Sequence, residues 1–263
     1  MPFTRTDTTQ APTITQQILY DFIKARFAAL GNYTLFDEFV ATTDRNVVYE
    51  YVLDNTKIFG KVYLRIRVTA ALAVTEFLYT SWNTATDTGT AASTETTTVT
   101  FASNIAVDAV NLVKGLEGKF CVLSQGTTIA FLGIWRPDNK PSAWNEDSFP
   151  FAFIQKNDWA TPWNIWFGCA SSPYGTTTAL NTYTTLLNDA RMGTQNPINN
   201  KRDILAGIVL FSPTQGVAGR SSDEMVIVAS SGLARFDPVQ VTAGVEEYLL
   251  LNPGNGGLAV RTV

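Results

Sequence analysis

Apolar residues recur at helical spacing close to the N-terminus, after a polar stretch that ends at Pro12. The recurring positions are Ile14, Ile18, Leu19, Phe22, Ile23, Phe27 and Leu30. A repeat of three to four residues places such side chains on one face of a helix. Thr13 or Thr15 can cap its start, and Gly31 can end it. The pattern therefore predicts an amphipathic helix, preceded by an extended arm over residues 1–12.

Alternating apolar and polar positions follow and predict strands. Between residues 61 and 68, apolar Val62, Leu64, Ile66 and Val68 alternate with Lys61, Tyr63, Arg65 and Arg67. Together with residues 46–52 this segment predicts a hairpin around Asp54 and Asn55 with one solvated face. Residues 71–82 predict a third strand. The threonine-rich residues 83–101 predict an exposed loop that rejoins the sheet at its end.

A second set of apolar segments begins after residue 115. Strands are predicted within residues 118–137, 149–154, 164–170, 204–211, 224–231, 244–251 and 257–263. Residues 178–192 have helical spacing and end at Gly193, which predicts a later helix. Residues 104–115 fit either period, and we interpret them as a helix. The expected fold is α+β, with mainly antiparallel sheets and two lobes at residues 1–115 and 116–263.

Composition favours a protein that is covered by neighbours. Of the 263 residues 45% are hydrophobic and only 16% are charged, against about 25% charged in typical soluble domains. A multi-copy assembly would explain this deficit. The net charge of -4 argues against nucleic-acid binding, which needs clustered basic residues. We also expect no membrane span, because no apolar run approaches the roughly 20 residues required.

The chain has no histidine, which removes the usual general base and the commonest transition-metal ligand. Carboxylates that could act as a glycosidase pair are Glu146, Asp147 and Asp158, with Glu246 and Glu247 elsewhere. Acidic residues in a proline-rich loop are more often solvated turn residues. Cys121 and Cys169 are expected to be buried free thiols, with a disulfide left open. We therefore expect no enzyme activity, cofactor or metal.

Five of the six tryptophans lie close together, at Trp135, Trp144, Trp159, Trp163 and Trp166. Three interpretations stay open: ordinary core, a subunit interface, or a platform for sugar rings. We expect the first and last of the five to be buried on strands. The other three are expected at the periphery, in contact with a neighbouring subunit.

Two arginines, Arg65 and Arg67, share one face of their predicted strand because side chains alternate with a period of two. They could pair with acidic groups of a neighbouring subunit. A solvated sheet face is the alternative.

Three segments together carry a resemblance to a known class of protein. They are "TITQQILYDFIKARFAALG" (13–31), "NTKIFGKVYLRIRVT" (55–69) and "TATDTGTAASTETTTVTF" (84–101). The chain resembles the minor virion structural proteins of tailed bacteriophages, of the neck, tail-terminator or baseplate type. The resemblance implies a ring-forming homo-oligomer that also contacts other virion proteins. It implies synthesis in the host cytoplasm and a final place in the virion. The alternative is a carbohydrate-binding, receptor-binding or lectin-like module that uses the tryptophan-rich region.

Overall fold

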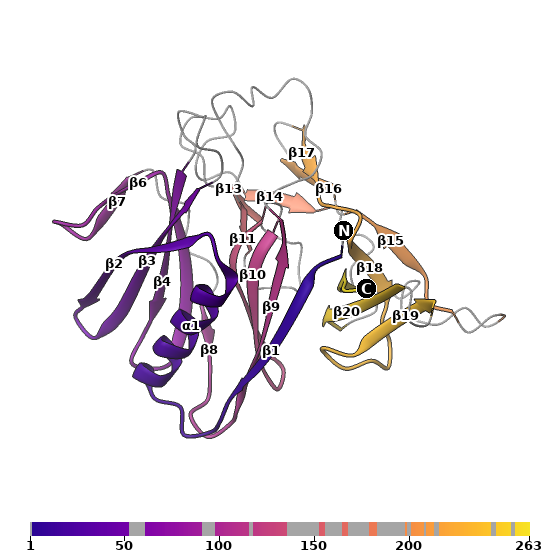
Figure 1. Cartoon of the computed structure of the whole chain (residues 1–263), viewed down its shortest axis with the longest axis horizontal. Coiled ribbons are helices and arrows are strands. Elements are labelled where there is room, and N and C mark those ends of the chain that lie inside the picture. The colour runs from indigo at the N-terminus through magenta and orange to yellow at the C-terminus, as the bar shows by residue number, and fades with distance from the viewer. Residues whose placement is uncertain are drawn as a thin grey trace.

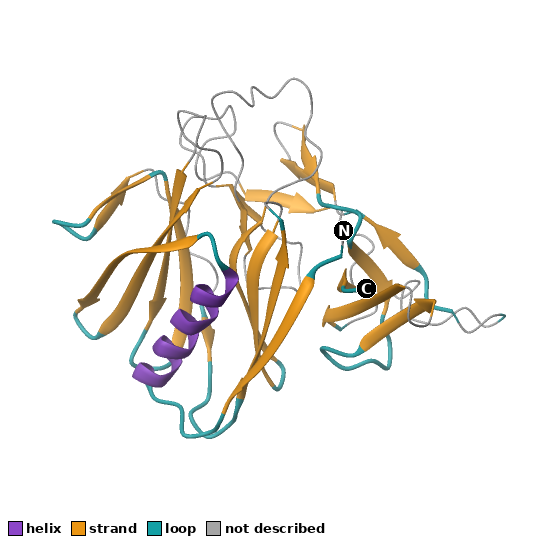
Figure 2. Ribbon diagram, in the orientation of Figure 1, coloured by secondary structure: helices purple, strands orange, loops and turns teal. Residues whose placement is uncertain are grey.

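The part of the chain that the structure describes is mostly β, with 60% of residues in strands and 9% in helix. The computed structural model describes residues 2–52, 61–90, 98–115, 118–135, 153–155, 165–167, 179–182, 198, 201–207, 209–212, 216–242, 246–253 and 256–263. In this part of the chain the strands form four antiparallel sheets beside one helix, α1 (Gln16–Leu30) (Figure 2). The predicted α+β class, with an N-terminal amphipathic helix and one later helix among the sheets, is therefore wrong.

The first large sheet has five strands in the order β2-β3-β4-β5-β8 (Figure 1). Their bounds are β2 (Tyr33–Ala41), β3 (Asp44–Val52), β4 (Lys61–Val68), β5 (Ala73–Tyr79) and β8 (Val99–Thr100). The strand pairing of the predicted hairpin is confirmed, because β3 and β4 pair from Arg45 opposite Val68 to Val52 opposite Lys61. Its predicted turn at Asp54 and Asn55 lies outside the described residues. A small hairpin follows β5, made of β6 (Ser81–Asn83) and β7 (Thr88–Thr90).

The second large sheet has nine strands in the order β1-β9-β10-β11-β12-β13-β14-β16-β17. The bounds are β1 (Thr4–Gln10), β9 (Val107–Lys114), β10 (Gly118–Gln125), β11 (Thr128–Trp135), β12 (Phe153–Gln155), β13 (Ile165–Phe167), β14 (Ala179–Thr182), β16 (Val209–Ser212) and β17 (Gly216–Arg220). The expected division between residues 115 and 116 falls in the connection between β9 and β10. These two strands pair with each other, with Lys114 opposite Gly118.

Two segments predicted as helix contain strands. Residues 107–114 form β9, which pairs with β1 on one side and β10 on the other. Both faces of β9 are largely buried, so its apolar positions fit a helical and a strand period equally well. Within 178–192, residues 179–182 form β14 and pair with β13 and β16. The pairing of their backbone with neighbouring strands overrides the helical spacing, and the rest of the segment lies outside the described residues.

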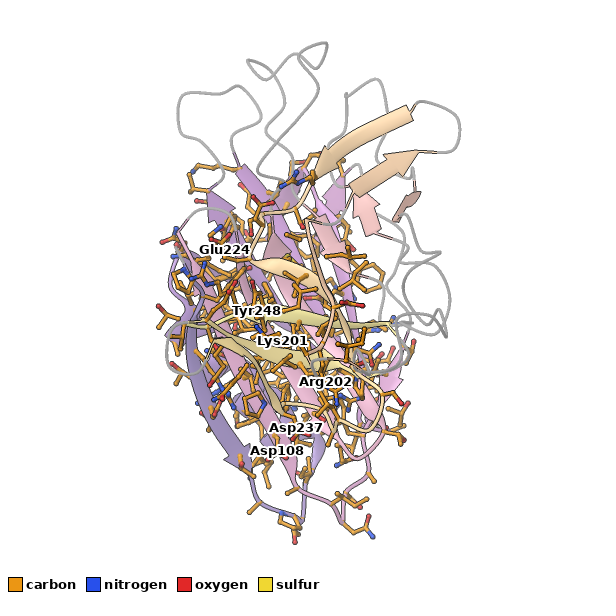
Figure 3. All side chains as sticks on the ribbon, turned by 90° about the vertical axis from the view of Figure 1, so that its right-hand side faces the viewer. Asp108, Lys201, Arg202, Glu224, Asp237 and Tyr248 are labelled. Atoms are coloured by element: carbon orange, nitrogen blue, oxygen red, sulfur yellow. The ribbon has the colours of Figure 1, made fainter. Side chains whose placement is uncertain are left out.

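A third sheet of five strands forms the C-terminal part, in the order β15-β18-β21-β20-β19. The bounds are β15 (Ile204–Ala206), β18 (Met225–Ala229), β19 (Pro238–Thr242), β20 (Glu246–Asn252) and β21 (Gly256–Arg261). Figure 3 looks onto this sheet, which lies in front of the nine-stranded sheet.

Two cationic side chains tie the C-terminal sheet to the nine-stranded sheet. Lys114 Nζ lies 2.9 Å from Glu224 Oε2, with both side chains largely buried. Burial alone would raise the pKa of Glu224, but hydrogen bonds, including the one from Lys114, lower this pKa to about 2. Arg235 donates to Ser124 Oγ and to three backbone oxygens in the turn between β10 and β11.

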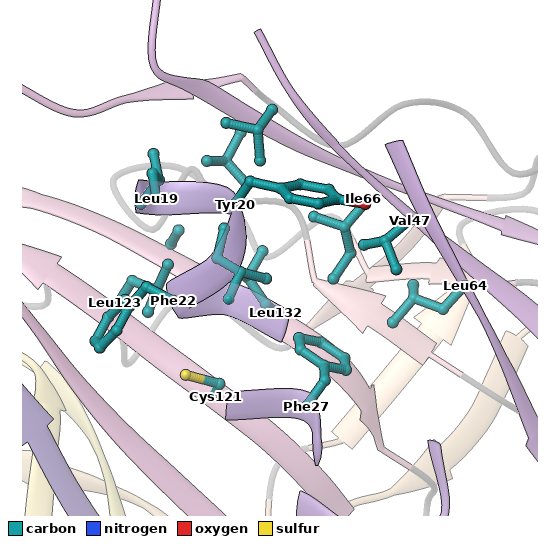
Figure 4. Close-up of a cluster of buried hydrophobic side chains, with 14 of the residues drawn as sticks. Leu19, Tyr20, Phe22, Phe27, Val47, Leu64, Ile66, Cys121, Leu123 and Leu132 are labelled. Atoms are coloured by element: carbon teal, nitrogen blue, oxygen red, sulfur yellow. The ribbon is translucent and has the colours of Figure 1, made fainter. Parts of the chain in front are cut away.

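The main core lies between the two large sheets and is closed on one side by α1 (Figure 4). The predicted helix is confirmed: Thr15 caps it by accepting from Ile18 N, and Gly31 follows its last residue. Phe27 stacks on Tyr49 at 4.8 Å between ring centroids. Cys121 is a buried free thiol in this core, as expected; Cys169 lies outside the described residues.

A polar junction joins the two large sheets inside the core. Tyr33 OH, from β2, accepts from Ile134 N at 2.7 Å and donates to Lys119 O at 2.6 Å, so the hydroxyl sits between β10 and β11. The neighbouring amide, Gly133 N, donates to Glu76 Oε1 of β5 at 2.7 Å. Gly133 has φ +120, and a Cβ there would lie 2.7 Å from Lys119 O. Glycine is thus required where the two sheets meet.

Candidate functional site

The outer face of the five-stranded sheet, turned away from α1, carries an unusual set of side chains. We define the aromatic–arginine face as Phe39, Tyr63, Arg65, Arg67, Phe77, Tyr79 and Trp82. Strand alternation places these residues together, because Tyr63, Arg65 and Arg67 pair with Tyr79, Phe77 and Thr75 of β5. Trp82 reaches the same face from the small β6–β7 hairpin beside the sheet (Figure 1).

Arg65 lies at the centre of this face. Its guanidinium carbon is 5.3 Å from the ring centroid of Phe39 and 5.1 Å from that of Phe77. These distances fall within the range of cation–π attraction. Nε and Nη2 both donate to Asn46 Oδ1, at 2.9 and 2.8 Å, and Nη1 approaches Tyr79 OH at 3.4 Å. The guanidinium thus lies near two rings, with its N–H groups directed at neutral oxygens.

Arg67 extends the same arrangement along β4. Its guanidinium carbon lies 5.4 Å from the Phe77 ring, and Nε is 3.9 Å from Asp44 Oδ2. The ring of Phe77 is therefore shared by two arginines. An ion pair at this separation on a partly exposed face contributes little to stability. Arg67 thus contacts a ring of β5 and lies near a carboxylate of β3.

Trp82 anchors the small hairpin to the face. Its ring lies 5.0 Å from that of Tyr79 and 5.9 Å from that of Phe39. The indole Nε1 donates to Asp37 Oδ2 at 2.6 Å. Trp82 is 9% exposed. It therefore serves to pack the hairpin and to engage one of the two carboxylates of β2.

The outer edge of the five-stranded sheet is apolar. β2 stands at the end of the strand order and spans nine residues, with a bulge between Leu35 and Asp37. We define the β2 edge patch as Leu35, Phe36 and Val40, which are 48%, 38% and 60% exposed. The Phe36 ring lies 4.9 Å from that of Tyr63, so this patch continues into the aromatic–arginine face.

The two acidic groups of β2 are engaged within the chain. Glu38 accepts from Lys24 Nζ and, at 2.8 Å, from Tyr20 OH, both on α1. The bond from Lys24 lowers the pKa of Glu38, although burial opposes the shift. Asp37 is bound by Trp82. Natural edge strands are usually protected by outward charges, and here both carboxylates contact groups of their own chain.

Tyr63 borders the face on the side of Glu50. Burial raises the pKa of the Tyr63 phenol, and the neighbouring Glu50 carboxylate raises it further. Tyr63 OH lies 3.3 Å from Glu50 Oε2, and Lys61 Nζ is 3.1 Å from Glu50 Oε1. The phenol is thus neutral near pH 7 and donates to the carboxylate.

Some of the predicted site residues lie in the described part of the chain, and others lie outside it. Arg65 and Arg67 share one face, as the period of two requires. Six predicted site residues lie outside the described residues: Trp144, Trp159, Trp163, Glu146, Asp147 and Asp158. For Trp135 on β11 and Trp166 on β13, only the backbone is described. Glu246 accepts from Tyr248 OH at 2.7 Å, and Glu247 Oε2 lies 3.3 Å from Gln240 Nε2.

Sequence reasoning missed Phe39 and Phe77, which contact the two arginines, and Trp82, which packs against Phe39. The alternation in β5 carried a signal for Phe77, because this strand pairs with β4. No local pattern could indicate that Trp82, three residues beyond β5, would contact Phe39 of β2.

Comparisons of the chain with protein-family models, with curated proteins and with solved structures find no match. In the part of the chain that the structure describes, no group of three or more Cys, Asp or Glu residues could hold a metal ion. The helix found there is not long and apolar enough to cross a membrane. The fold and the site therefore define a β-rich protein with a candidate contact surface on one sheet.

Proposed function

We propose that this protein is a structural component that assembles with copies of itself, of the type that forms rings in the neck, tail or baseplate of a tailed phage virion. Its β2 edge patch and aromatic–arginine face would contact the neighbouring subunit. The observation that carries this proposal is the exposure of three large apolar side chains along a nine-residue edge strand. Exposed apolar strand edges readily pair with another chain.

Two further features support an interface over a solvated face. Arg65 and the aromatic rings around it are residue types enriched at the centres of protein interfaces. The carboxylates of β2 contact Lys24, Tyr20 and Trp82 of the same chain. A partner that pairs with this edge would therefore meet carboxylates that already accept hydrogen bonds from their own chain.

The proposal is tested by the native mass of the whole protein and of the variant Leu35→Ser. Wild type should run as a multimer, whereas Leu35→Ser should shift the dissociation midpoint at least tenfold towards higher concentration. Ile105→Ser is the matched control, because Ile105 is also 48% exposed but lies in the loop before β9. Equal effects of both variants, or a monomeric wild type, would refute the proposal. Circular dichroism should show unchanged secondary structure in both.

The alternative is a carbohydrate-binding module that uses Trp144, Trp159 and Trp163, which lie outside the described residues. It stays a prediction. The two functions give opposite results in one assay: a monomer whose tryptophan fluorescence responds to saccharides favours the module, and a multimer with no response favours the structural role.

A further inference from the structure

We infer that strand β1 is exchanged between adjoining copies, so that β1 of one copy pairs with β9 of the next. The inference rests on the proposed assembly of several copies and names the segment that would link them. It concerns a surface distinct from the β2 edge patch, because β1 and β2 lie at the ends of two different sheets.

β1 is attached to the nine-stranded sheet mainly through its backbone. It pairs with β9 over seven residues, from Thr4 opposite Val113 to Gln10 opposite Val107. No side chain within β1 is buried. The buried anchor precedes the strand: the Phe3 ring lies 5.7 Å from that of Phe120, and Phe3 N donates to Arg261 O at 2.9 Å. Strand and anchor can thus move to a second copy without taking core residues from α1 or β2.

The segment between β1 and α1 has the properties of a strained hinge. Thr13 has φ +75, a conformation that is unfavourable for a β-branched residue. Thr13 N and Ile14 N both donate to Ser103 O, at 2.9 and 2.8 Å, and the Ile14 side chain is buried. Residues 11–13 therefore turn sharply between two fixed points. Short hinges under strain favour exchange, because an opened hinge releases the strain while all strand contacts are kept.

Every contact of β1 can form equally well with a second copy. Thr9 Oγ1 donates to Asp108 Oδ1 at 2.7 Å, and Arg26 Nη1 of α1 contacts Thr8 Oγ1. Asp108 is labelled in Figure 3 and lies opposite Thr9 of β1, at the side of the nine-stranded sheet where β1 is the last strand. Three extended residues span about 10 Å, so the receiving β9 must belong to a directly adjoining copy. Exchange in one direction around a ring would use β1 and β9 as a head-to-tail contact.

The test introduces the two cysteines of one disulfide into different copies of the protein. Thr9 and Asp108 are exposed, in contact and opposite each other in the register, and antiparallel partners lie within disulfide range. Both native cysteines are first replaced by alanine. Copies that then carry Thr9→Cys are unfolded and refolded with copies that carry Asp108→Cys, and are oxidised mildly. A covalent dimer on a non-reducing gel is expected from the mixture and from neither variant alone.

The double variant Thr9→Cys/Asp108→Cys separates this inference from the proposed function. Covalent multimers are expected after oxidation. A multimeric native mass with only intramolecular disulfides would overturn strand exchange and leave the assembly intact. A monomeric native mass would overturn both.

Hinge strain is tested by Thr13→Gly, which can adopt φ +75 without a steric penalty. This variant should lower the yield of covalent dimer from the mixed refolding at least twofold. Thr42→Gly is the matched control, because Thr42 has φ +58 in the turn between β2 and β3. An equal yield from wild type and Thr13→Gly backgrounds would contradict the role of the hinge.

Discussion

Replacing Glu76 with glutamine should remove a pH dependence of stability that a buried carboxyl creates. Glu76 is 0% exposed and accepts from Gly133 N across the two large sheets. Burial raises the pKa of this carboxyl well above its ordinary value, and the Gly133 bond opposes the shift only in part. The folded protein therefore retains a proton that the unfolded chain releases above its ordinary pKa near 4.

The sign of the effect follows from this difference in bound protons. The stability that the protonated group contributes is complete below the unfolded pKa and is lost as pH rises towards the folded pKa. One proton changes the free energy of unfolding by at most about 1.4 kcal/mol per pH unit. Between pH 5 and pH 7 the wild type should thus lose at most about 2.7 kcal/mol through Glu76.

The composition makes this measurement clean. The chain has no histidine, so no side chain with an ordinary pKa near 6.5 titrates in the window. The free energy of unfolding in urea is measured for wild type and Glu76→Gln at pH 5, 6 and 7. The value for wild type minus the value for the variant should decrease as the pH rises. Glutamine keeps the oxygen that accepts from Gly133, so the variant should be the more stable protein at pH 7.

A matched substitution guards against a general effect of removing one negative charge. Glu247→Gln changes a partly exposed carboxylate near Gln240 and should keep the wild-type slope. If Glu76→Gln also keeps the wild-type slope, or is less stable than wild type by the same amount at all three pH values, the reasoning is refuted.

Three further predictions concern packing and charge, and each is checked by urea unfolding. Gly133→Ala should cost at least about 3 kcal/mol, because its Cβ would overlap a backbone oxygen. Gly126→Ala is the control and should cost about 1 kcal/mol, because Gly126 has φ +57 but open space around it. Similar costs for the two variants would contradict the crowding at Gly133. Lys114→Met should cost about 3 kcal/mol by removing the largely buried ammonium that pairs with Glu224. Adding Glu224→Leu should recover part of this loss, and no recovery would contradict the role of the pair. Arg65→Lys should cost about 1 kcal/mol, because an ammonium cannot keep both ring contacts and both bonds to Asn46. A neutral result would contradict the importance of these contacts.

The candidate site could be predicted only in part. Arg65 and Arg67 share a face because alternation along one strand fixes it. The rings that they contact come from β2 and β5, and which strands become neighbours depends on sheet order. Spacing within a single segment carries no information on that order.

The sequence by itself determined the elements whose signal is local. The spacing of apolar residues, the Thr15 cap and Gly31 define α1, and strict alternation defines β4. Tertiary structure decided residues 107–114 and 179–182, where apolar positions fit a helix but the backbone pairs with neighbouring strands. It also decided the junction of Tyr33, Glu76 and Gly133. The physical reason is that strand pairing and buried polar contacts join residues far apart in the chain, whereas helix caps and side-chain periods act within a few residues.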